Sequence, residues 1–380
     1  MRRTVAVGAT LVILAALGAV LWLGRWQLVE RRAGGDAFWY ARSAFLLAGS
    51  SDDDATRGAA EVMVRYRGQP AEGWLAAPDT VDARYEAIFR ARPLYPAVAA
   101  PFVASLGPDA LVAAALVGGI ALAVAVAWVG LLISGSWWTG ALASVLVFVL
   151  PSGAFVAYLA PEGWMLAAWT VGLGAAVLHL DRPRARMLAV LAVAIAVISV
   201  TKSANAGVLA VALVAVAVIA SARKVPMRRA AVGAAATASS VFVASVVAGA
   251  ALGLPGLTES VQDLLTDHFT KPDVASPWLE LVLLDARQVP RWALGLLRAP
   301  VELGLVVAGA ISLARYGGER AFPWLVGGAA TVLVVFAHPV TSEIPRLLAP
   351  IWVAVALGLA AATARGIAMV RGRALRPAAR

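Results

Sequence analysis

The chain has 380 residues, of which 61% are hydrophobic and 14% charged, and its mean hydropathy is +0.82. Soluble domains carry about 25% charged residues, so this composition excludes a soluble globular protein and predicts a polytopic α-helical membrane protein. The absence of cysteine excludes a disulfide framework or a thiolate metal site. The net charge of +10 is typical of basic cytoplasmic loops in a membrane protein, and we do not expect a nucleic-acid partner.

The first apolar segment follows Arg2 and Arg3 and covers residues 4–24, which carry no charged side chain. A run of about 20 apolar residues is long enough to span the hydrocarbon core of a bilayer. A signal peptide has a shorter apolar core and ends at small residues, whereas Trp22 and Arg25 occupy that place here. The sequence therefore predicts an uncleaved first membrane helix.

The large polar stretch at residues 25–107 follows this helix and is predicted to form a loop outside the cytoplasm. It contains Asp36 and an acidic run at 52–54, which is interpreted as a solvated turn in preference to a metal site. Its helical character is concentrated at about 55–67 and 79–91. An apolar piece at 97–106 is too short to span, so we expect it to dip into the membrane or to lie along it.

Further apolar segments predict an all-α, polytopic transmembrane bundle of about ten helices, with nine or eleven as alternatives. After the first helix, the expected spans are 108–133, 137–158, 163–180, 187–201, 204–221, 230–253, 299–314, 321–337 and 347–364. Residues 1–380 thus form a single membrane domain, with a second outer loop at 254–298 and a basic tail at 365–380. Many of these segments are rich in alanine and glycine, which lets helices pack closely in lipid.

Arginine marks the predicted cytoplasmic side. Four segments are rich in arginine and contain only two acids: 181–186, 223–229, 315–320 and 365–380. By the positive-inside rule they lie in the cytoplasm with both termini, which predicts a multi-pass protein of the cytoplasmic membrane. Only three of the 32 basic residues are lysine, a bias typical of a high-GC bacterial gene.

Ionisable residues are scarce inside the predicted spans, which argues against an ion-coupled transporter. They collect at the predicted outer face, as Asp36, Glu86, Arg90, Arg92, Glu162, Lys202, His338, Glu343 and Arg346. The second outer loop adds Glu259, Asp263, Asp267, His268, Lys271, Asp285, Arg287 and Arg291. Acids and bases gathered at one membrane interface indicate an enzyme that acts on an amphiphile.

Asp36 is predicted to begin a helix at 37–47, where the helix dipole keeps a carboxylate ionised. We expect Gly34 and Gly35 before it to supply backbone dihedrals that other residues avoid. The alternative interpretation of Asp36 is a plain helix N-cap. For Lys202 and Arg346 the alternative is a side chain that reaches to the interface without binding a ligand.

The chain resembles the GT-C superfamily of polytopic glycosyltransferases through degenerate signatures that occur in the family's order. These are Gly35-Asp36-Ala37-Phe38-Trp39-Tyr40-Ala41, Arg92-Pro93-Leu94-Tyr95-Pro96, Pro161-Glu162, Thr201-Lys202 and Glu343-Ile344-Pro345-Arg346-Leu347-Leu348-Ala349-Pro350. Two departures accompany the resemblance. Ala37 stands where many members have a second acid, and a short arginine-rich tail stands where many have a large soluble domain.

The resemblance implies an inverting transfer of a sugar from a polyprenyl-phosphate donor to a cell-envelope glycan or lipid, outside the cytoplasm. Asp36 matches the family's catalytic acid, which acts as a general base or positions the acceptor. The substrate-binding residues that we expect are Tyr40, Glu86, Arg92, Tyr95, Glu162, Lys202, His338, Glu343 and Arg346. No metal or other cofactor is expected, and the partners are membrane lipid, the lipid-linked donor and the acceptor, with a membrane partner subunit left open. The alternatives are a transporter or flippase of a lipid-linked intermediate and a non-catalytic envelope-assembly protein.

Overall fold

The computed structural model describes residues 2–30 and 32–374, with side chains described for 9–30 and 32–369. All regular structure in these residues is helical, which confirms the predicted all-α class. Within the described chain, seven helical stretches are long and apolar enough to cross a membrane, so the chain is a multi-pass membrane protein. The count of about ten crossings stays a prediction.

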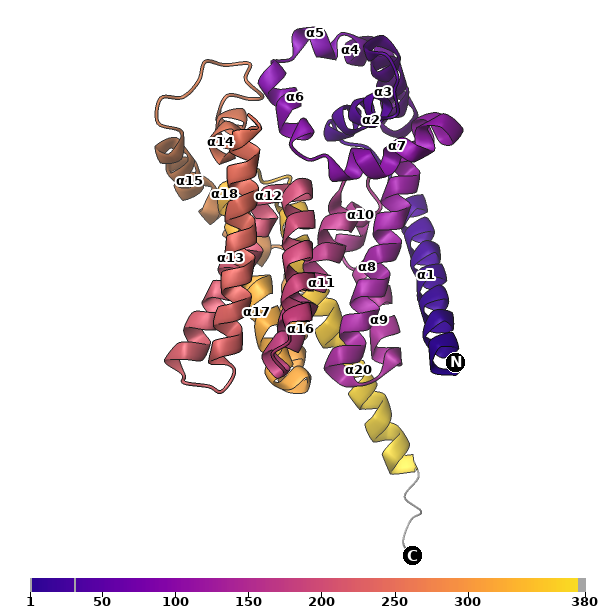
Figure 1. The fold of residues 1–380 in the computed structure, drawn as a ribbon, viewed down its shortest axis with the longest axis vertical. Helices are drawn as coiled ribbons and strands as arrows, with labels where there is room; N and C mark the ends of the chain where they lie inside the picture. Colours follow the sequence, from indigo (N-terminus) through magenta and orange to yellow (C-terminus); the bar gives the residue numbers. More distant parts are fainter. Residues whose placement is uncertain (1, 31, 375–380) are drawn as a thin grey trace, which may run out of the picture.

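The long apolar helices run side by side along one axis of the molecule (Figure 1). They are α1 (Arg2–Leu28), α8 (Ala110–Ser134), α9 (Trp137–Val149), α11 (Glu162–Asp181), α12 (Ala185–Ala222), α13 (Arg228–Ala251), α16 (Pro300–Gly317), α17 (Ala321–Ala330) and α20 (Ala349–Ala374). Small residues set their spacing: a Cβ added to Gly140 of α9 would lie 2.2 Å from the Ala127 carbonyl oxygen of α8. Such close approach of backbones stabilises helix packing in lipid. Of the predicted basic tail at 365–380, the first part continues α20, and residues 375–380 lie outside the described residues.

Helix α12 contains 38 residues and is interrupted at Lys202, where φ is −152° and ψ is 87°. Arg184, just before α12, donates its N–H to His179 at the end of α11, at 3.1 Å. The early part of α13, which follows α12, also lies beside His179, because a Cβ added to Gly233 would lie 3.5 Å from that side chain. Lys202 contacts Glu162 at the opposite end of α11. The chain therefore reverses direction at Lys202, where the two predicted spans 187–201 and 204–221 meet.

The stretch from α16 to α18 (Val332–Ala337) reverses in a similar way at the short helix η2 (Gly318–Arg320). The Arg320 side chain donates to Asp181 at the end of α11, with 2.7 Å between Nε and Oδ2. A further short helix, α19 (Ile344–Leu347), follows α18 and returns to the end of α11 that carries Glu162. A short helix α10 (Ser152–Val156) precedes the turn into that same end.

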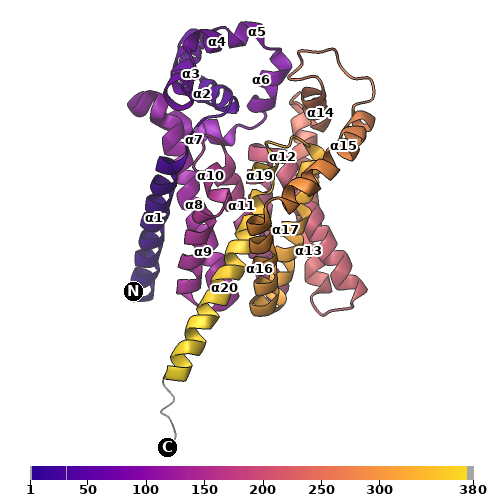
Figure 2. The same ribbon diagram turned by 180° about the vertical axis from the view of Figure 1, so that it is seen from behind.

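The predicted first outer loop folds into a helical cap at one end of the bundle, above α1 and α8 (Figures 1 and 2). Its elements are α2 (Asp36–Leu47), α3 (Asp52–Arg67), α4 (Ala71–Leu75), α5 (Ala77–Thr80), α6 (Ala83–Arg90), α7 (Leu94–Leu106) and η1 (Gly107–Asp109). Helices α3 and α6 correspond to the two predicted helical parts, and α7 contains the short apolar piece. The acidic run forms the first turn of α3, where the helix dipole favours negative charge.

Aromatic rings hold the cap together. The rings of Trp39 and Phe89 stack with centroids 6.3 Å apart, and the ring of Tyr40 meets that of Tyr95 edge-on at 5.6 Å. These pairs join α2 to α6 and α7, and such arrangements stabilise beyond the area that they bury. The aromatic residues next to Asp36 therefore build a rigid support for the helix that Asp36 begins.

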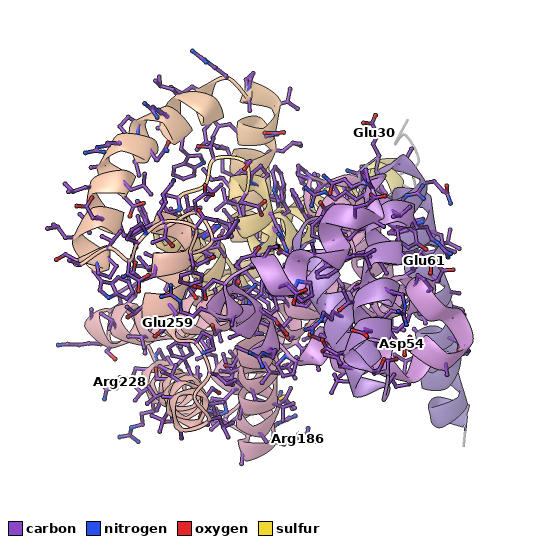
Figure 3. The ribbon with its side chains drawn as sticks, turned by 90° about the horizontal axis from the view of Figure 1, so that it is seen from above. Glu30, Asp54, Glu61, Arg186, Arg228 and Glu259 are labelled. Atoms are coloured by element: carbon purple, nitrogen blue, oxygen red, sulfur yellow. The ribbon has the colours of Figure 1, made fainter. Side chains whose placement is uncertain are left out.

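The predicted second outer loop contains α14 (Leu257–Leu265) and α15 (Pro277–Leu297). From above, Glu259 of α14 lies over a different part of the bundle from Asp54 and Glu61 of α3 (Figure 3). The two loops nevertheless touch, because Arg84 of α6 donates to both oxygens of Asp273 at 2.9 and 2.8 Å. The ring of Tyr85 also packs on that of His268, with centroids 4.5 Å apart. The segment 267–269 has three consecutive non-glycine residues with positive φ, a strained turn that these contacts hold in place.

Candidate functional site

Arg346 of α19 lies at the centre of a cluster of charged residues at the end of the bundle beneath the cap. Its guanidinium donates to Asp36 Oδ2 at 3.3 and 3.4 Å and to Glu343 Oε2 at 3.2 Å. Its Nε also donates to Glu162 Oε1. The Arg346 side chain is only 12% exposed, so a largely buried cation joins the neighbouring Glu343 to two carboxylates from distant parts of the chain, Asp36 and Glu162.

Glu162 is the first residue of α11, where the helix dipole favours a carboxylate. Its side chain is 0% exposed, and its Oε1 accepts hydrogen bonds from both Arg346 and Lys202 Nζ, the latter at 2.5 Å. Lys202 reaches it from the break in α12. The other oxygen, Oε2, is buried without a hydrogen-bond partner. Glu162 thus compensates two cations in a place where an unpaired charge would be costly.

Asp36 begins α2 as predicted, and its carboxylate is directed to Arg346. The N-cap of α2 is Gly35, with no side-chain capping bond, so the structure gives no support to the interpretation of Asp36 as a helix cap. Burial raises the pKa of Asp36, but the charges of Arg346, Arg92 and Lys202 lower it by more, and the pKa lies below its usual value. The side chain is 30% exposed, so Asp36 is an ionised carboxylate that a ligand can reach.

The two glycines before Asp36 act differently from the prediction. Neither Gly34 nor Gly35 has a positive φ, so the expectation of unusual dihedrals is wrong. Gly34 instead lies close to another side chain: an added Cβ would lie 3.1 Å from the hydroxyl of Tyr158, which would have to shift slightly. The Leu159 N–H also donates to the Arg32 carbonyl oxygen at 2.8 Å, which fastens the segment before Asp36 to the turn before Glu162.

Arg92, Tyr40 and Tyr95 flank the cluster. The Arg92 guanidinium lies 3.5 Å from the Tyr40 hydroxyl and interacts electrostatically with Asp36. Burial raises the pKa of Tyr40, so its hydroxyl stays protonated. The Tyr95 hydroxyl donates to the Leu111 carbonyl oxygen at 2.9 Å, which leaves Tyr95 as a buried support under Tyr40.

His338 follows α18 and interacts electrostatically with Glu343 and Lys202, so it belongs to the surroundings of the cluster. Burial lowers the pKa of His338, which keeps the imidazole neutral at about pH 7. A neutral imidazole both donates and accepts a hydrogen bond. His338 therefore adds hydrogen-bonding capacity at the site without adding charge.

The structure does not bring Glu86 to the cluster. Its carboxylate accepts a hydrogen bond from Arg42 at 2.6 Å, and Arg42 also donates to Asp52 at 2.6 Å and to Thr56 at 3.2 Å. Glu86 thus ties α6 to α2 and α3 inside the cap. The sequence places Glu86 on the correct loop, but only the packing of the cap reveals which cation it meets.

An apolar cavity of ≈ 430 Å³ lies between α8, α11 and α12 and is open to the surface of the bundle. It is lined by Ala121, Trp164, Ala167, Ala168, Val171, Ala189, Val190, Val193, Ala194 and Val197. No residue of the charged cluster is among these lining residues. Sequence reasoning missed this cavity, because the pairing of α11 with α12 cannot be read from alanine and valine alone.

Tyr158 is a further residue that sequence reasoning missed. It lies in the turn before Pro161-Glu162 and interacts electrostatically with Arg346 and Asp36. Burial raises the pKa of Tyr158, so its hydroxyl remains a proton donor. The only sequence signal is its position three residues before Pro161.

In the part of the chain that the structure describes, no group of three or more His, Asp or Glu residues has a geometry that fits a metal ion. No protein-family model and no curated protein matches this chain. The geometry of the cluster is therefore what supports a function.

Proposed function

We propose that the chain is an integral membrane glycosyltransferase of the GT-C type. It transfers a sugar from a polyprenyl-phosphate donor to a hydroxyl of a cell-envelope glycan or lipid, on the outer face of the cytoplasmic membrane. The observation that carries the proposal is the cluster itself: Arg346 links an accessible carboxylate, Asp36, to the buried Glu162 and Lys202 pair. In this proposal the hydrocarbon part of the donor lies against the apolar cavity between α8, α11 and α12, and its phosphate lies at the cluster.

Asp36 is the proposed general base. It accepts the proton of the acceptor hydroxyl while the hydroxyl oxygen bonds to the anomeric carbon of the donor sugar. The bond from the anomeric carbon to the phosphate oxygen breaks, and its electron pair leaves with the lipid phosphate. Attack on the face opposite the leaving group inverts the anomeric centre.

Lys202 and Arg346 are the proposed phosphate ligands. An ammonium has three N–H donors, of which one is bonded to Glu162, and the guanidinium has a planar set of five. Lys202 therefore keeps two free donors, whereas Arg346 makes four hydrogen bonds to three carboxylates and keeps one. Paired bonds from Arg346 to a phosphate form when the phosphate replaces one of these carboxylate contacts. Their positive charge stabilises the negative charge that develops on the leaving phosphate.

The Arg346→Lys variant is expected to use the donor poorly although its charge is retained. A guanidinium binds phosphate with paired hydrogen bonds, and each bond to a charged group contributes about 1.5–3 kcal/mol. We expect KM for the donor to rise about 10- to 100-fold, measured with the enzyme in proteoliposomes. The matched control is Arg84→Lys, because Arg84 pairs with Asp273 at the junction of the loops. Equal effects in both variants would contradict the assignment.

The proposed topology has ten crossings, with both termini in the cytoplasm. The crossings are α1, α8, α9 with α10, α11, the first and second halves of α12, α13, α16, α17 with α18, and α20. The reversals at Lys202 and at η2 support it, because each converts one long stretch into two passes. A reporter fused after residue 75 is expected to behave as extracytoplasmic, and one fused after residue 226 as cytoplasmic. The reverse labelling would place the cluster on the wrong face for this function.

One observation favours a transporter or flippase as the second candidate. Helix α12 is broken at a charged residue, and broken helices form the substrate sites of many transporters. In those proteins the break lies near the middle of the membrane, whereas Lys202 lies beside the first residue of α11. A direct comparison decides between the two: incubation of proteoliposomes with polyprenyl-phosphate sugars and envelope lipids yields a glycosylated product for a transferase. Movement of the donor across the bilayer without a new product indicates a flippase.

A further inference from the structure

Helix α15 lies at the edge of the molecule and joins the second outer loop to α16 (Figures 1 and 2). It carries Glu280, Asp285, Arg287 and Arg291, and it is not among the helices apolar enough to cross a membrane. Only Leu281 is buried within the chain. Helix α15 is thus attached to the protein along one narrow face.

The face of α15 that points away from the protein is entirely apolar. The more buried positions fall on one side of the helix and mark its inner face; they are Pro277, Leu281, Leu284, Asp285, Gln288, Val289, Trp292 and Leu296. On the opposite side the exposed residues are Leu279, Val282, Leu283, Leu294 and Leu297. Val282 is 62% exposed and Leu297 is 68% exposed, so this face has no partner within the described chain. A contiguous apolar face of this kind is typical of an interaction surface.

A row of charged residues borders this apolar face. Glu280, Arg287, Arg291 and Arg298 are spaced by seven, four and seven residues, which places them on one edge of the helix. Three of the four are arginines, whose guanidinium groups bind phosphate. An apolar face beside an arginine row is the pattern of a helix that lies in a membrane interface.

Helices near α15 in sequence also carry exposed apolar residues. At the end of α13 and just beyond it, Val247 and Leu252 are exposed, and at the start of α16 Val301 is exposed. These residues belong to or adjoin helices that are apolar enough to cross the bilayer. Helix α16 directly follows α15 and packs against it, so α15 is attached to a helix that lipid surrounds.

We propose that α15 is a membrane-surface helix. Its apolar face lies among the acyl chains at the edge of one leaflet, and Arg287, Arg291 and Arg298 bind the phosphate groups of anionic phospholipids. This inference does not depend on the glycosyltransferase activity. Because Arg84 and Tyr85 fasten the same loop to the cap, α15 also anchors the joined outer loops to the lipid surface.

Spin labels on single cysteines test the proposal in the full chain, which has no native cysteine. The labels are placed at Val282, Leu283 and Leu294 on the apolar face and at Arg287 in the charged row, with the protein in liposomes of phosphatidylcholine and phosphatidylglycerol. The matched control is a label at Val64, an exposed apolar residue of α3 in the cap. We expect collisions with oxygen to exceed those with a water-soluble nickel chelate several-fold at 282, 283 and 294. At 64 and 287 we expect collisions with the nickel chelate to exceed those with oxygen.

A second measurement addresses the arginine row. The Arg287→Gln, Arg291→Gln double variant is expected to lose the preference for spin-labelled phosphatidylglycerol over phosphatidylcholine that the parent shows, whereas Arg57→Gln on α3 retains it. Labels on the apolar face that are as accessible to nickel as the label at 64 would overturn the proposal. Labels shielded from both reagents would also overturn it, because they would show that a protein partner or a second copy covers α15.

Discussion

The Asp36→Asn variant is expected to fold and insert normally and to lose sugar transfer by roughly 10²–10⁴-fold, the usual contribution of a general base. Asparagine keeps the size of aspartate, and its amide oxygen still accepts a hydrogen bond from Arg346. It lacks the basic carboxylate oxygen that takes the proton of the acceptor hydroxyl. The loss should therefore appear in kcat, while KM for the donor changes little.

The measurement is the initial rate of glycosylated product in proteoliposomes, with thermal unfolding of the purified variant as the control for folding. Asp53→Asn provides a matched substitution, because Asp53 lies on the same loop in the first turn of α3 and outside the cluster. Full activity of Asp36→Asn would remove Asp36 from the reaction.

The pKa of Asp36 also predicts how kcat depends on pH. Burial raises the pKa of Asp36, but the surrounding cations lower it by a larger amount. The pKa in the folded state therefore lies below the usual value. A base with a lowered pKa stays ionised as the pH falls and loses its function only below that pKa. The acid limb of kcat is therefore expected below about pH 4, the ordinary pKa of aspartate, as long as Asp36 sets it. Arg346→Gln removes the first of the lowering charges and should move that limb to higher pH.

Hydropathy was sufficient to place the site residues at helix boundaries. Asp36 begins α2, Glu162 begins α11, and Lys202 lies at the break in α12, in each case where an apolar segment starts or ends. Charged residues in such a chain are confined to those places because the interior of the membrane excludes them. The predicted clustering at one face follows from the same constraint.

The partners within the cluster could not be predicted. Arg346 meets Asp36 across 310 positions in sequence, and no periodicity or composition encodes such a contact. The expectation for Glu86 rested on its presence in the first loop, yet its position on α6 turns it toward Arg42. The contact between Tyr85 and His268 depends on a strained turn that no sequence pattern marked.

Hydropathy and length alone also do not determine the number of membrane crossings. Hydropathy and length identify seven candidate spans in the described chain, because 185–222 and 300–337 each count as one stretch and Trp137–Val149 is too short. The reversal depends on a single residue, Lys202, that leaves the helical region of backbone dihedrals. Its charge was the sequence signal that separated 187–201 from 204–221, because a lysine is costly in the middle of a long span.

The Glu162→Gln variant is expected to lose both thermal stability and sugar transfer. Glu162 is 0% exposed, and one of its oxygens accepts hydrogen bonds from Lys202 and Arg346 together. Glutamine keeps the volume and one acceptor oxygen, but it leaves two buried cations side by side without their shared counter-charge. Removing one member of a buried ion pair costs about 3–5 kcal/mol, so the Tm in detergent should fall clearly. Glu343→Gln is the matched control, because Glu343 is 39% exposed and accepts a single hydrogen bond from Arg346.

An anion should partly reverse the loss in Glu162→Gln. If Lys202 and Arg346 form the phosphate site, the uncompensated pair in this variant binds an anion more strongly than the parent does. Polyprenyl phosphate is therefore expected to raise the Tm of Glu162→Gln by more than it raises that of the parent, because a ligand stabilises the state that binds it. A variant whose Tm falls but does not respond to polyprenyl phosphate would show that Glu162 stabilises the fold while the phosphate binds elsewhere. A variant with unchanged Tm and unchanged turnover would mean that the buried ion pair contributes to neither, since the substitution removes the charge on which both effects depend.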